Sequence, residues 1–162
     1  MIQHNSPDPS AVPGPSAHHD PGAHHDPSIV AQIIDDAFPQ IHIGGRVLHV
    51  DAVSAEHCDV RLTAHERLLR PGGTISGPSL FTVADYAAYV AIVARRGADG
   101  LTAATSTMTI NFLSRPAAKD VLARTSILRE GRRTMVIDIA MRTVGESDLV
   151  AHAVANYVLP KR

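Results

Sequence analysis

A single acidic residue, Asp85, lies inside a long apolar stretch and is the strongest candidate for chemistry in this chain. From residue 79 to residue 94 the sequence reads SLFTVADYAAYVAIVA, and Asp85 is its only charged residue. A segment that is apolar on every side is typical of a helix buried inside a domain. An ionised carboxylate is costly there unless it is paired or hydrated, and no Lys, Arg or His lies within two helical turns. Such a group can activate water or attack a substrate; the alternative is a structural Asp that reaches a backbone donor.

Length, charge and cysteine content favour one domain in a reducing compartment. The chain has 162 residues and a formal charge of −1, so no strong electrostatic field favours nucleic acid or a membrane surface. Its one cysteine, Cys58, cannot form an internal disulfide, which favours the cytoplasm. We find no pattern typical of a signal peptide, and the acidic residue in the apolar helix argues against a membrane span.

Residues 1–27 differ in composition from the rest of the chain. They contain six of the eleven prolines and a tandem repeat, AHHDPG followed by AHHDPS. A segment with so few apolar side chains cannot offset the entropy of ordering, so we predict a disordered tail ahead of a domain at 28–162. Adjacent histidines on a flexible segment make a poor rigid metal site, and we predict none.

Helix caps, turn residues and the spacing of apolar residues predict the helices and strands in the first half of the domain. Ser28 can cap a short helix that Pro39 ends, and Gly97 follows two arginines at the exit of the apolar helix. In chain order we expect a helix at 29–38, a strand at 40–53 bent at Gly44–Gly45, a strand at 57–63, a loop at 70–78 and the apolar helix from 79 to about 96.

After the apolar helix, two kinds of side chain alternate along the sequence with a period of two. Between residues 104 and 112, Ala104, Ser106, Met108, Ile110 and Phe112 share one predicted face, and Thr105, Thr107, Thr109 and Asn111 share the other. Further strands are predicted at 120–128, around 135–141 and at 149–159, joined by short turns, which indicates an antiparallel meander. A single antiparallel sheet wrapped around one apolar helix satisfies this order, giving an α+β fold class.

The order of elements and several local motifs resemble the hotdog fold, and more narrowly the acyl-CoA thioesterases of the phenylacetic-acid-degradation (PaaI-like) type. The resemblance covers roughly residues 51–160, and family members typically read N-x5-H-G-G-x7-D-x-A across the loop and central helix. Here Arg70 stands in place of the Asn, and Ser76-Gly77-Pro78 in place of His-Gly-Gly. The nine-residue step from Ser76 to Asp85 is kept; the other matching stretches are Thr109–Leu113 with Arg115-Pro116, the turn at Glu130–Arg133, and Ala155–Tyr157.

The resemblance implies hydrolysis of an acyl-CoA thioester to a free acid and CoA. Asp85 would activate water or attack the carbonyl directly. The N–H of Gly77 at the helix N-terminus would bind the developing oxyanion, a contribution of roughly 3 kcal/mol. Ser76 would bind the carbonyl or water, or only cap the helix. Thr105 falls where family members place a hydroxyl that reaches the partner subunit's active site.

Other side chains are candidates for binding the acyl group and CoA. Phe81 and Tyr89 lie one turn on either side of Asp85, on the same helix face, and are predicted to line the acyl slot. No separate cofactor is expected, because CoA is part of the substrate. The predicted contacts to its phosphates are Arg70, Arg115, Lys119, Arg132 and Arg133.

The fold implies a homo-oligomer. One sheet around one helix leaves an exposed edge, which we place at the Thr-rich strand near Thr105, and hotdog subunits pair such edges into dimers or dimers of dimers that share their active sites. Two alternatives remain: a non-catalytic protein that binds acyl-CoA, and an enoyl-thioester hydratase or dehydratase. The second is disfavoured because no His lies between His65 and His152 to serve the central helix.

Overall fold

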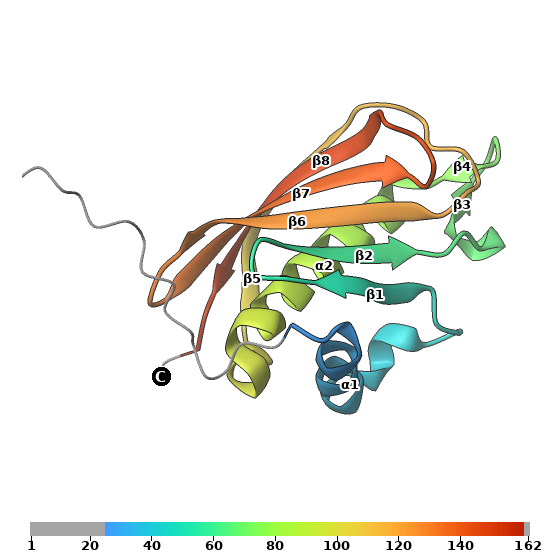
Figure 1. The fold of residues 1–162 in the computed structure, drawn as a ribbon. Coiled ribbons are helices and arrows are strands. Elements are labelled where there is room, and N and C mark those ends of the chain that lie inside the picture. The colour runs from blue at the N-terminus through green and yellow to red at the C-terminus, as the bar shows by residue number, and fades with distance from the viewer. Residues whose placement is uncertain (1–24, 161–162) are drawn as a thin grey trace, which may run out of the picture.

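A computed structural model describes residues 25–160, in which a six-stranded antiparallel sheet curves around one long helix (Figure 1). Residues 1–24, which make up most of the predicted tail, lie outside the described part, as do residues 161–162. The larger elements are α1 (Pro27–Ala37), β1 (Leu48–Val53), β2 (His57–Leu62), α2 (Gly77–Arg96), β5 (Ala104–Phe112), β6 (Val121–Glu130), β7 (Thr134–Thr143) and β8 (Leu149–Val158). The short ones are η1 (Pro39–His42), η2 (Glu66–Leu68), β3 (Leu69–Arg70), β4 (Thr74–Ile75) and η3 (Gly97–Gly100).

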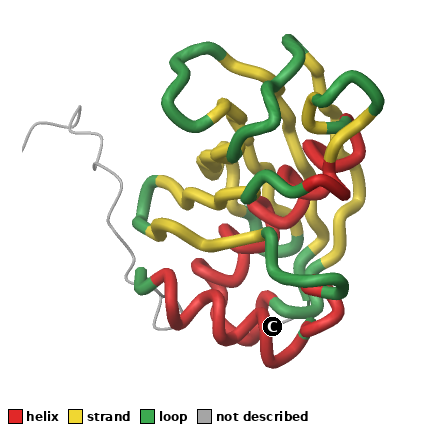
Figure 2. The backbone as a smooth tube through the Cα atoms, turned by 90° about the vertical axis from the view of Figure 1, so that its right-hand side faces the viewer, coloured by secondary structure: helices red, strands yellow, loops and turns green. Residues whose placement is uncertain are grey.

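Helix α2 is the centre of the core, as its apolar sequence predicts. Small side chains such as Ala84, Ala87 and Ala88 are fully buried, which lets the sheet approach the helix closely. The segment is long and apolar enough to cross a membrane by composition, but 67% of its most apolar window is buried within this domain. The view turned by 90° (Figure 2) shows the strands curving past the helical segments. This is the expected α+β hotdog architecture, and the fold-class prediction is confirmed.

The strand order is β1-β2-β6-β7-β8-β5, which corrects part of the predicted meander. Strands β6, β7 and β8 are consecutive antiparallel neighbours, as expected. Strand β5 pairs with β8 instead of β6, because β2 and β7 occupy the two sides of β6. The chain therefore crosses from one edge of the sheet towards its middle between Phe112 and Val121. As predicted, the strand containing Thr105 is an edge strand.

A one-residue bulge in β5 changes which face Thr105 occupies. The register shifts between Thr105, opposite Tyr157, and Thr107, opposite Asn156. The sequence pattern placed Thr105 on the same face as Thr107, and this prediction was wrong. Because a bulge inserts one residue into a strand, Thr105 joins Met108 on the face towards α2, while Thr107 points outward and accepts a hydrogen bond from the side chain of Asn156.

Two predictions at the start of the domain were also wrong in detail. Helix α1 is capped by Asp26, whose carboxylate accepts hydrogen bonds from the amide and hydroxyl of Ser28 at 2.8 and 2.6 Å. The predicted strand from residue 40 begins only at Leu48, because residues 39–42 form a 3-10 turn. Gly44 and Gly45 then have φ values of 82° and 106°, and two consecutive positive φ angles are incompatible with an extended strand.

The C-terminal end of α2 is tied to the sheet by Glu130, the last residue of β6. One carboxylate oxygen accepts from Arg95 at 3.0 Å and the other pairs with Arg96 at 2.7 Å. The Arg96 side chain is only 11% exposed, so the Glu130 carboxylate compensates the cost of burying its charge.

We expect Glu130→Gln to lower the free energy of unfolding by about 2 kcal/mol, because it leaves a nearly buried guanidinium without its anion. Urea denaturation would measure the change. Glu146→Gln is the matched control: its pair with Lys119 spans 3.5 Å and both side chains are about half exposed, so we expect a loss of about 0.5 kcal/mol or less. Equal losses in the two variants would contradict the proposed role of Glu130.

Candidate active site

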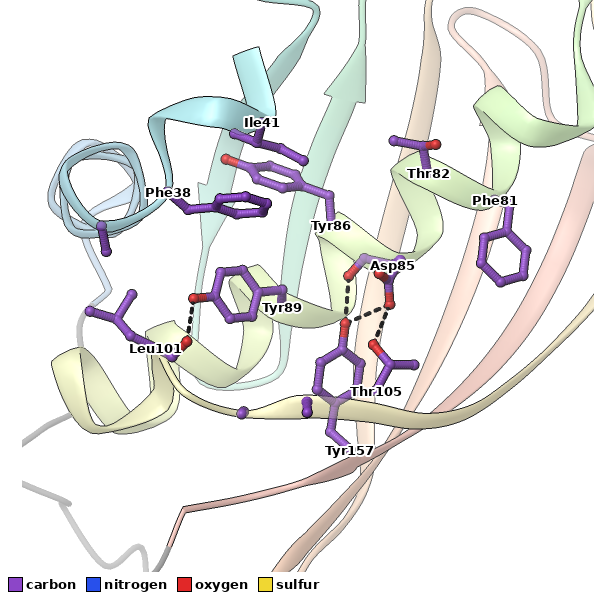
Figure 3. Close-up of a pocket in the computed structure, with 13 residues that line it drawn as sticks. Phe38, Ile41, Phe81, Thr82, Asp85, Tyr86, Tyr89, Leu101, Thr105 and Tyr157 are labelled. Atoms are coloured by element: carbon purple, nitrogen blue, oxygen red, sulfur yellow. Dashed lines mark hydrogen bonds between the residues drawn. The ribbon is translucent and has the colours of Figure 1, made fainter. Parts of the chain in front are cut away.

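A cavity of about 520 Å³ lies along α2 and has Asp85 in its wall (Figure 3). Its other walls come from the end of α1 and η1, from the segment after η3, and from the start of β5 and the end of β8. Among the described residues that line it, Asp85 is the one carboxylate, and none carries a cationic side chain. The predicted acyl-slot residues Phe81 and Tyr89 both line this cavity, on either side of Asp85 along the helix.

Two hydroxyl groups hold one oxygen of the Asp85 carboxylate. Oδ1 accepts from Thr105 Oγ1 at 2.8 Å and from Tyr157 Oη at 2.6 Å, as drawn in Figure 3. The Tyr157 hydroxyl also lies 3.1 Å from the backbone carbonyl oxygen of Asp85. The second oxygen, Oδ2, accepts no hydrogen bond from any residue between 25 and 160. The side chain is therefore fixed through one oxygen while the other stays free to act on a substrate.

The strand register brings both hydroxyl groups to the same point on the helix. Thr105 and Tyr157 are direct partners across β5 and β8, and the bulge turns Thr105 inward beside Tyr157. Burial, together with the hydrogen bond to the Asp85 carboxylate, raises the pKa of the Tyr157 phenol, so it stays protonated and donates. Thr105 was predicted to serve a partner subunit's site; within this chain its hydroxyl reaches the chain's own Asp85.

Ser76 caps α2 in the structure. Its Oγ accepts the amide of Ser79 at 3.3 Å and lies 2.7 Å from the Ser79 hydroxyl, which donates to the backbone oxygen of Leu68 at 3.0 Å. Of the two roles predicted for Ser76, capping is the one visible here.

The amide of Gly77 is the unpaired donor at the helix start. Pro78 has no N–H, the amide of Ser79 is capped, and Gly77 has no acceptor within residues 25–160. Asp85 lies eight positions after Gly77, which amounts to about 12 Å along a helix. The structure therefore does not bring the predicted oxyanion donor and the carboxylate of one chain to the same reacting atom.

The five predicted CoA-binding cations are all on exposed residues and fall into two groups at opposite ends of α2. The loop after β5 contacts the β3–β4 hairpin near the helix start, where the amide of Ile75 donates to the carbonyl of Pro116 at 3.3 Å. The turn after β6 lies at the helix end, where Arg96 reaches the carbonyl of Gly131 at 3.3 Å. The first group contains Arg70, Arg115 and Lys119, and the second contains Arg132 and Arg133.

Sequence reasoning missed several residues of the cavity. Tyr157 was noted only as part of a motif, although alternation along β8 places it with Ala153 and Ala155 on the buried face. Phe38 and Ile41 were missed because the segment that carries them was predicted as a helix end and a strand. Within the described residues no group of three or more potential metal ligands is present, and the histidine pairs of the tail lie outside that part.

Comparison with known proteins identifies the family. Residues 72–149 match the family model described as the thioesterase superfamily. A solved structure of a "putative thioesterase" from Silicibacter sp. TM1040 is 32% identical, with a TM-score of 0.74, covering 86% of this chain and 96% of the other. The chain belongs to the thioesterase superfamily, and its hotdog fold and resemblance to PaaI-like members are confirmed.

Two further relatives match a smaller share of the chain. A "putative esterase" of Saccharolobus solfataricus is 31% identical over 101 residues, 62% of this chain, and the match spans 65% of that protein's length. A variant of the phenylacetic acid degradation protein PaaI from Thermus thermophilus shares the fold, with 23% identity and a TM-score of 0.61 over 70% of this chain and 93% of the other.

Two buried tyrosines of the cavity wall differ in their hydrogen bonding, and we expect their phenylalanine variants to differ in stability. The Tyr86 hydroxyl is buried with no partner in residues 25–160, whereas Tyr157 donates to the Asp85 carboxylate. Tyr86→Phe should leave the free energy of unfolding unchanged or raise it by up to about 1 kcal/mol, and Tyr157→Phe should lower it by about 2 kcal/mol. Urea denaturation of both variants tests this; similar losses in the two would contradict it.

Proposed function

We propose that this protein hydrolyses acyl-CoA thioesters and that Asp85 is the catalytic carboxylate. The observation that carries the proposal is the carboxylate in the cavity wall, held through one oxygen by Thr105 and Tyr157 with its other oxygen uncommitted. A general base or nucleophile needs this combination of fixed orientation and free lone pairs. Membership of the thioesterase superfamily supports the same reaction class.

The proposed reaction transfers the acyl group to water. Asp85 takes a proton from water as the oxygen adds to the thioester carbonyl, or its free oxygen adds first and water cleaves the resulting anhydride. The tetrahedral intermediate collapses by breaking the carbon–sulfur bond, and the CoA sulfur leaves as a thiolate that is then protonated. Free acid and CoA are the products on either route. Thr105 and Tyr157 orient the carboxylate throughout, which preserves the attack geometry.

A second copy of the chain would complete the site. A donor for the developing oxyanion must lie about 3 Å from the carbonyl oxygen, and Gly77 of the same chain is about 12 Å along the helix from Asp85. Strand β5 is a free edge, and pairing two such edges about a two-fold axis makes the two strands antiparallel. In that arrangement the start of one α2 faces the end of the other, so the partner subunit would supply the amide.

The same arrangement would assemble the CoA-binding cations. The partner's helix start would bring its Arg70 and Arg115 positions towards the end of α2 where this chain has Arg132 and Arg133. None of these four makes a salt bridge with residues 25–160, so their charges are available for the phosphates. Lys119 pairs with Glu146 at 3.5 Å, an exposed contact weak enough to exchange for a phosphate.

The alternatives predict different outcomes. A hydratase or dehydratase of this fold would set a histidine against the acid, and no histidine lines the cavity among the described residues. A non-catalytic acyl-CoA binder would use the same cavity without turnover.

The buried, lone Cys58 fits the proposed reducing, cytoplasmic setting.

We expect Asp85→Asn to lower the rate of acyl-CoA hydrolysis by at least about 100-fold, because the amide cannot accept the proton or form the acyl intermediate. The assay is a panel of acyl-CoAs with a thiol-trapping dye that detects released CoA. Asp138→Asn is the matched control: Asp138 is also half-buried and hydrogen-bonded, to His152 at 2.7 Å, but lies outside the cavity.

The protein's own thiol does not disturb this assay. Cys58 is 3% exposed, and burial raises its pKa to about 11, so almost none is thiolate at pH 8. A full rate in Asp85→Asn would reject the catalytic role of Asp85. Thermal stabilisation by acyl-CoA without turnover in the wild type would support the binder instead.

Complementation between two inactive variants tests the shared site. Gly77→Pro deletes the amide N–H at a position that accepts proline, since Ser76 before it is extended at φ −75° and ψ 154°. A random mixture of Gly77→Pro and Asp85→Asn chains should regain roughly a quarter of the wild-type rate, since half the dimers carry one intact site of two.

The control for this experiment is Gly77→Ala, which keeps the N–H. A β-carbon at Gly77 would lie 3.5 Å from the Phe112 ring, an ordinary contact, so we expect this variant to stay active. If the mixture remains inactive although mixed dimers of the two variants form, both groups act within one chain and the shared-site proposal fails.

A further inference from the structure

One end of the cavity is built by residues that precede the sheet. Ala37, Phe38 and Ile41 line it from the end of α1 and from η1, opposite Tyr89 and Leu101 (Figure 3). Phe38 lines the cavity and is also 42% exposed, so its ring lies at the surface as well as in the cavity wall. The size of this side chain therefore affects how far the cavity extends in that direction.

The segment that forms this wall, α1 and η1, is held to the rest of the domain by several contacts. Helix α1 is anchored by the fully buried Val30 and Ile34. Near the end of this helix, the carboxylate of Asp35 pairs with His42 at 2.8 Å and with Arg46 at 2.5 Å, which joins α1 to η1 and to the segment after it. The Arg67 guanidinium donates to the backbone oxygens of residues 44 and 45 just beyond. These contacts restrain the backbone on either side of Phe38 and Ile41, which preorganises this end of the cavity.

The opposite side of this end is also fixed. The Tyr89 hydroxyl donates to the backbone oxygen of Leu101 at 2.8 Å, which holds the tyrosine ring and the segment after η3 together. Tyr89 lies one helical turn beyond Asp85, about 6 Å along the axis. An acyl group that extends from Asp85 towards this end therefore meets Tyr89 after about one helical turn, and Phe38 and Leu101 line the same end of the cavity.

The charges of the lining restrict the acyl group further. Asp85 is the one charged side chain among the described lining residues. A second carboxylate on the acyl group would be repelled by Asp85 and would find no cation in the cavity to compensate its desolvation.

We propose that Phe38, which follows α1 and lines the same end of the cavity as Tyr89 and Leu101, is a specificity-determining residue that limits the length of the uncharged acyl group this cavity accepts. The inference rests on the proposed function for the identity of its ligand, an acyl-CoA. It concerns the length and charge of the acyl chain and not the hydrolytic step.

The test measures binding without turnover. S-alkyl-CoA thioethers with chains of increasing length contain no carbonyl to attack, so calorimetry reports only how the cavity accepts the chain. In the wild type, affinity should rise with chain length and then fall once the chain reaches Phe38. A thioether ending in a carboxylate should bind at least about tenfold more weakly than its methyl-ended counterpart.

Substitutions at Phe38 should move the length limit in both directions. Phe38→Ala should improve binding of chains beyond the wild-type limit by about tenfold or more, and Phe38→Trp should shorten the limit. Ile29→Ala is the matched control, since Ile29 lies in α1, which Phe38 directly follows, and is 45% exposed but does not line the cavity; it should bind as the wild type does.

An unchanged length limit in both Phe38 variants overturns the inference, as does failure of every thioether to bind. A protein that binds the thioethers with this limit but hydrolyses no acyl-CoA retains the inference and rejects the proposed hydrolysis. The two failures are therefore distinguishable.

Discussion

The Asp85 carboxylate can occupy the wall of a cavity whose described lining offers it no cation, because two hydroxyl groups donate to one of its oxygens. This interaction joins three elements, since Asp85 belongs to α2, Thr105 to the edge strand β5 and Tyr157 to its neighbour β8. Hydrogen bonds to a charged group contribute more than those between neutral groups, so they also fix the rotation of the helix against the sheet. The requirement to stabilise one negative charge thereby sets the geometry of the whole site.

A second constraint comes from the length of the helix. Asp85 and the free amide of Gly77 lie on one α-helix, and its rise of about 1.5 Å per residue places the two residues about 12 Å apart along the axis. An Asp side chain is too short to close that gap. The unpaired edge of β5 offers a way to bring the two groups together between copies of the chain. In a two-fold contact the carboxylate of each chain can face the amide of the other, so two equivalent sites form. The proposed catalysis and the proposed dimer are thus two consequences of one helix geometry.

The segment before the sheet adds a separate function to this framework. In the hotdog arrangement the sheet and α2 supply the core and the carboxylate, while α1 and η1 complete the cavity from outside. Their anchoring contacts use side chains that take no part in the Asp85 cluster. Variation in this segment could therefore change which acyl groups enter the cavity and leave the carboxylate and its two hydroxyl partners in place.

Much of the fold and the central residue of the site could be predicted from the sequence, because the signals for them are local. The uninterrupted apolar run around Asp85 predicts a buried helix, and the period of two after residue 104 predicts strands. Both depend only on side chains close together in the chain. The edge position of β5 came from the resemblance to hotdog proteins, and the structure agrees with it.

The partners of Asp85 depended on contacts between distant residues. Alternation alone placed Thr105 on the same face as Thr107, and the bulge opposite Tyr157 reverses that assignment because one inserted residue exchanges the faces of a strand. The pairing of β5 with β8 likewise follows from β2 occupying the side of β6, a competition that no local pattern contains. By itself the sequence determined that a carboxylate would lie on a buried central helix. Only the tertiary structure decided which hydroxyl groups hold it and which side chains surround it, because strand register and pairing are settled by packing across the whole sheet.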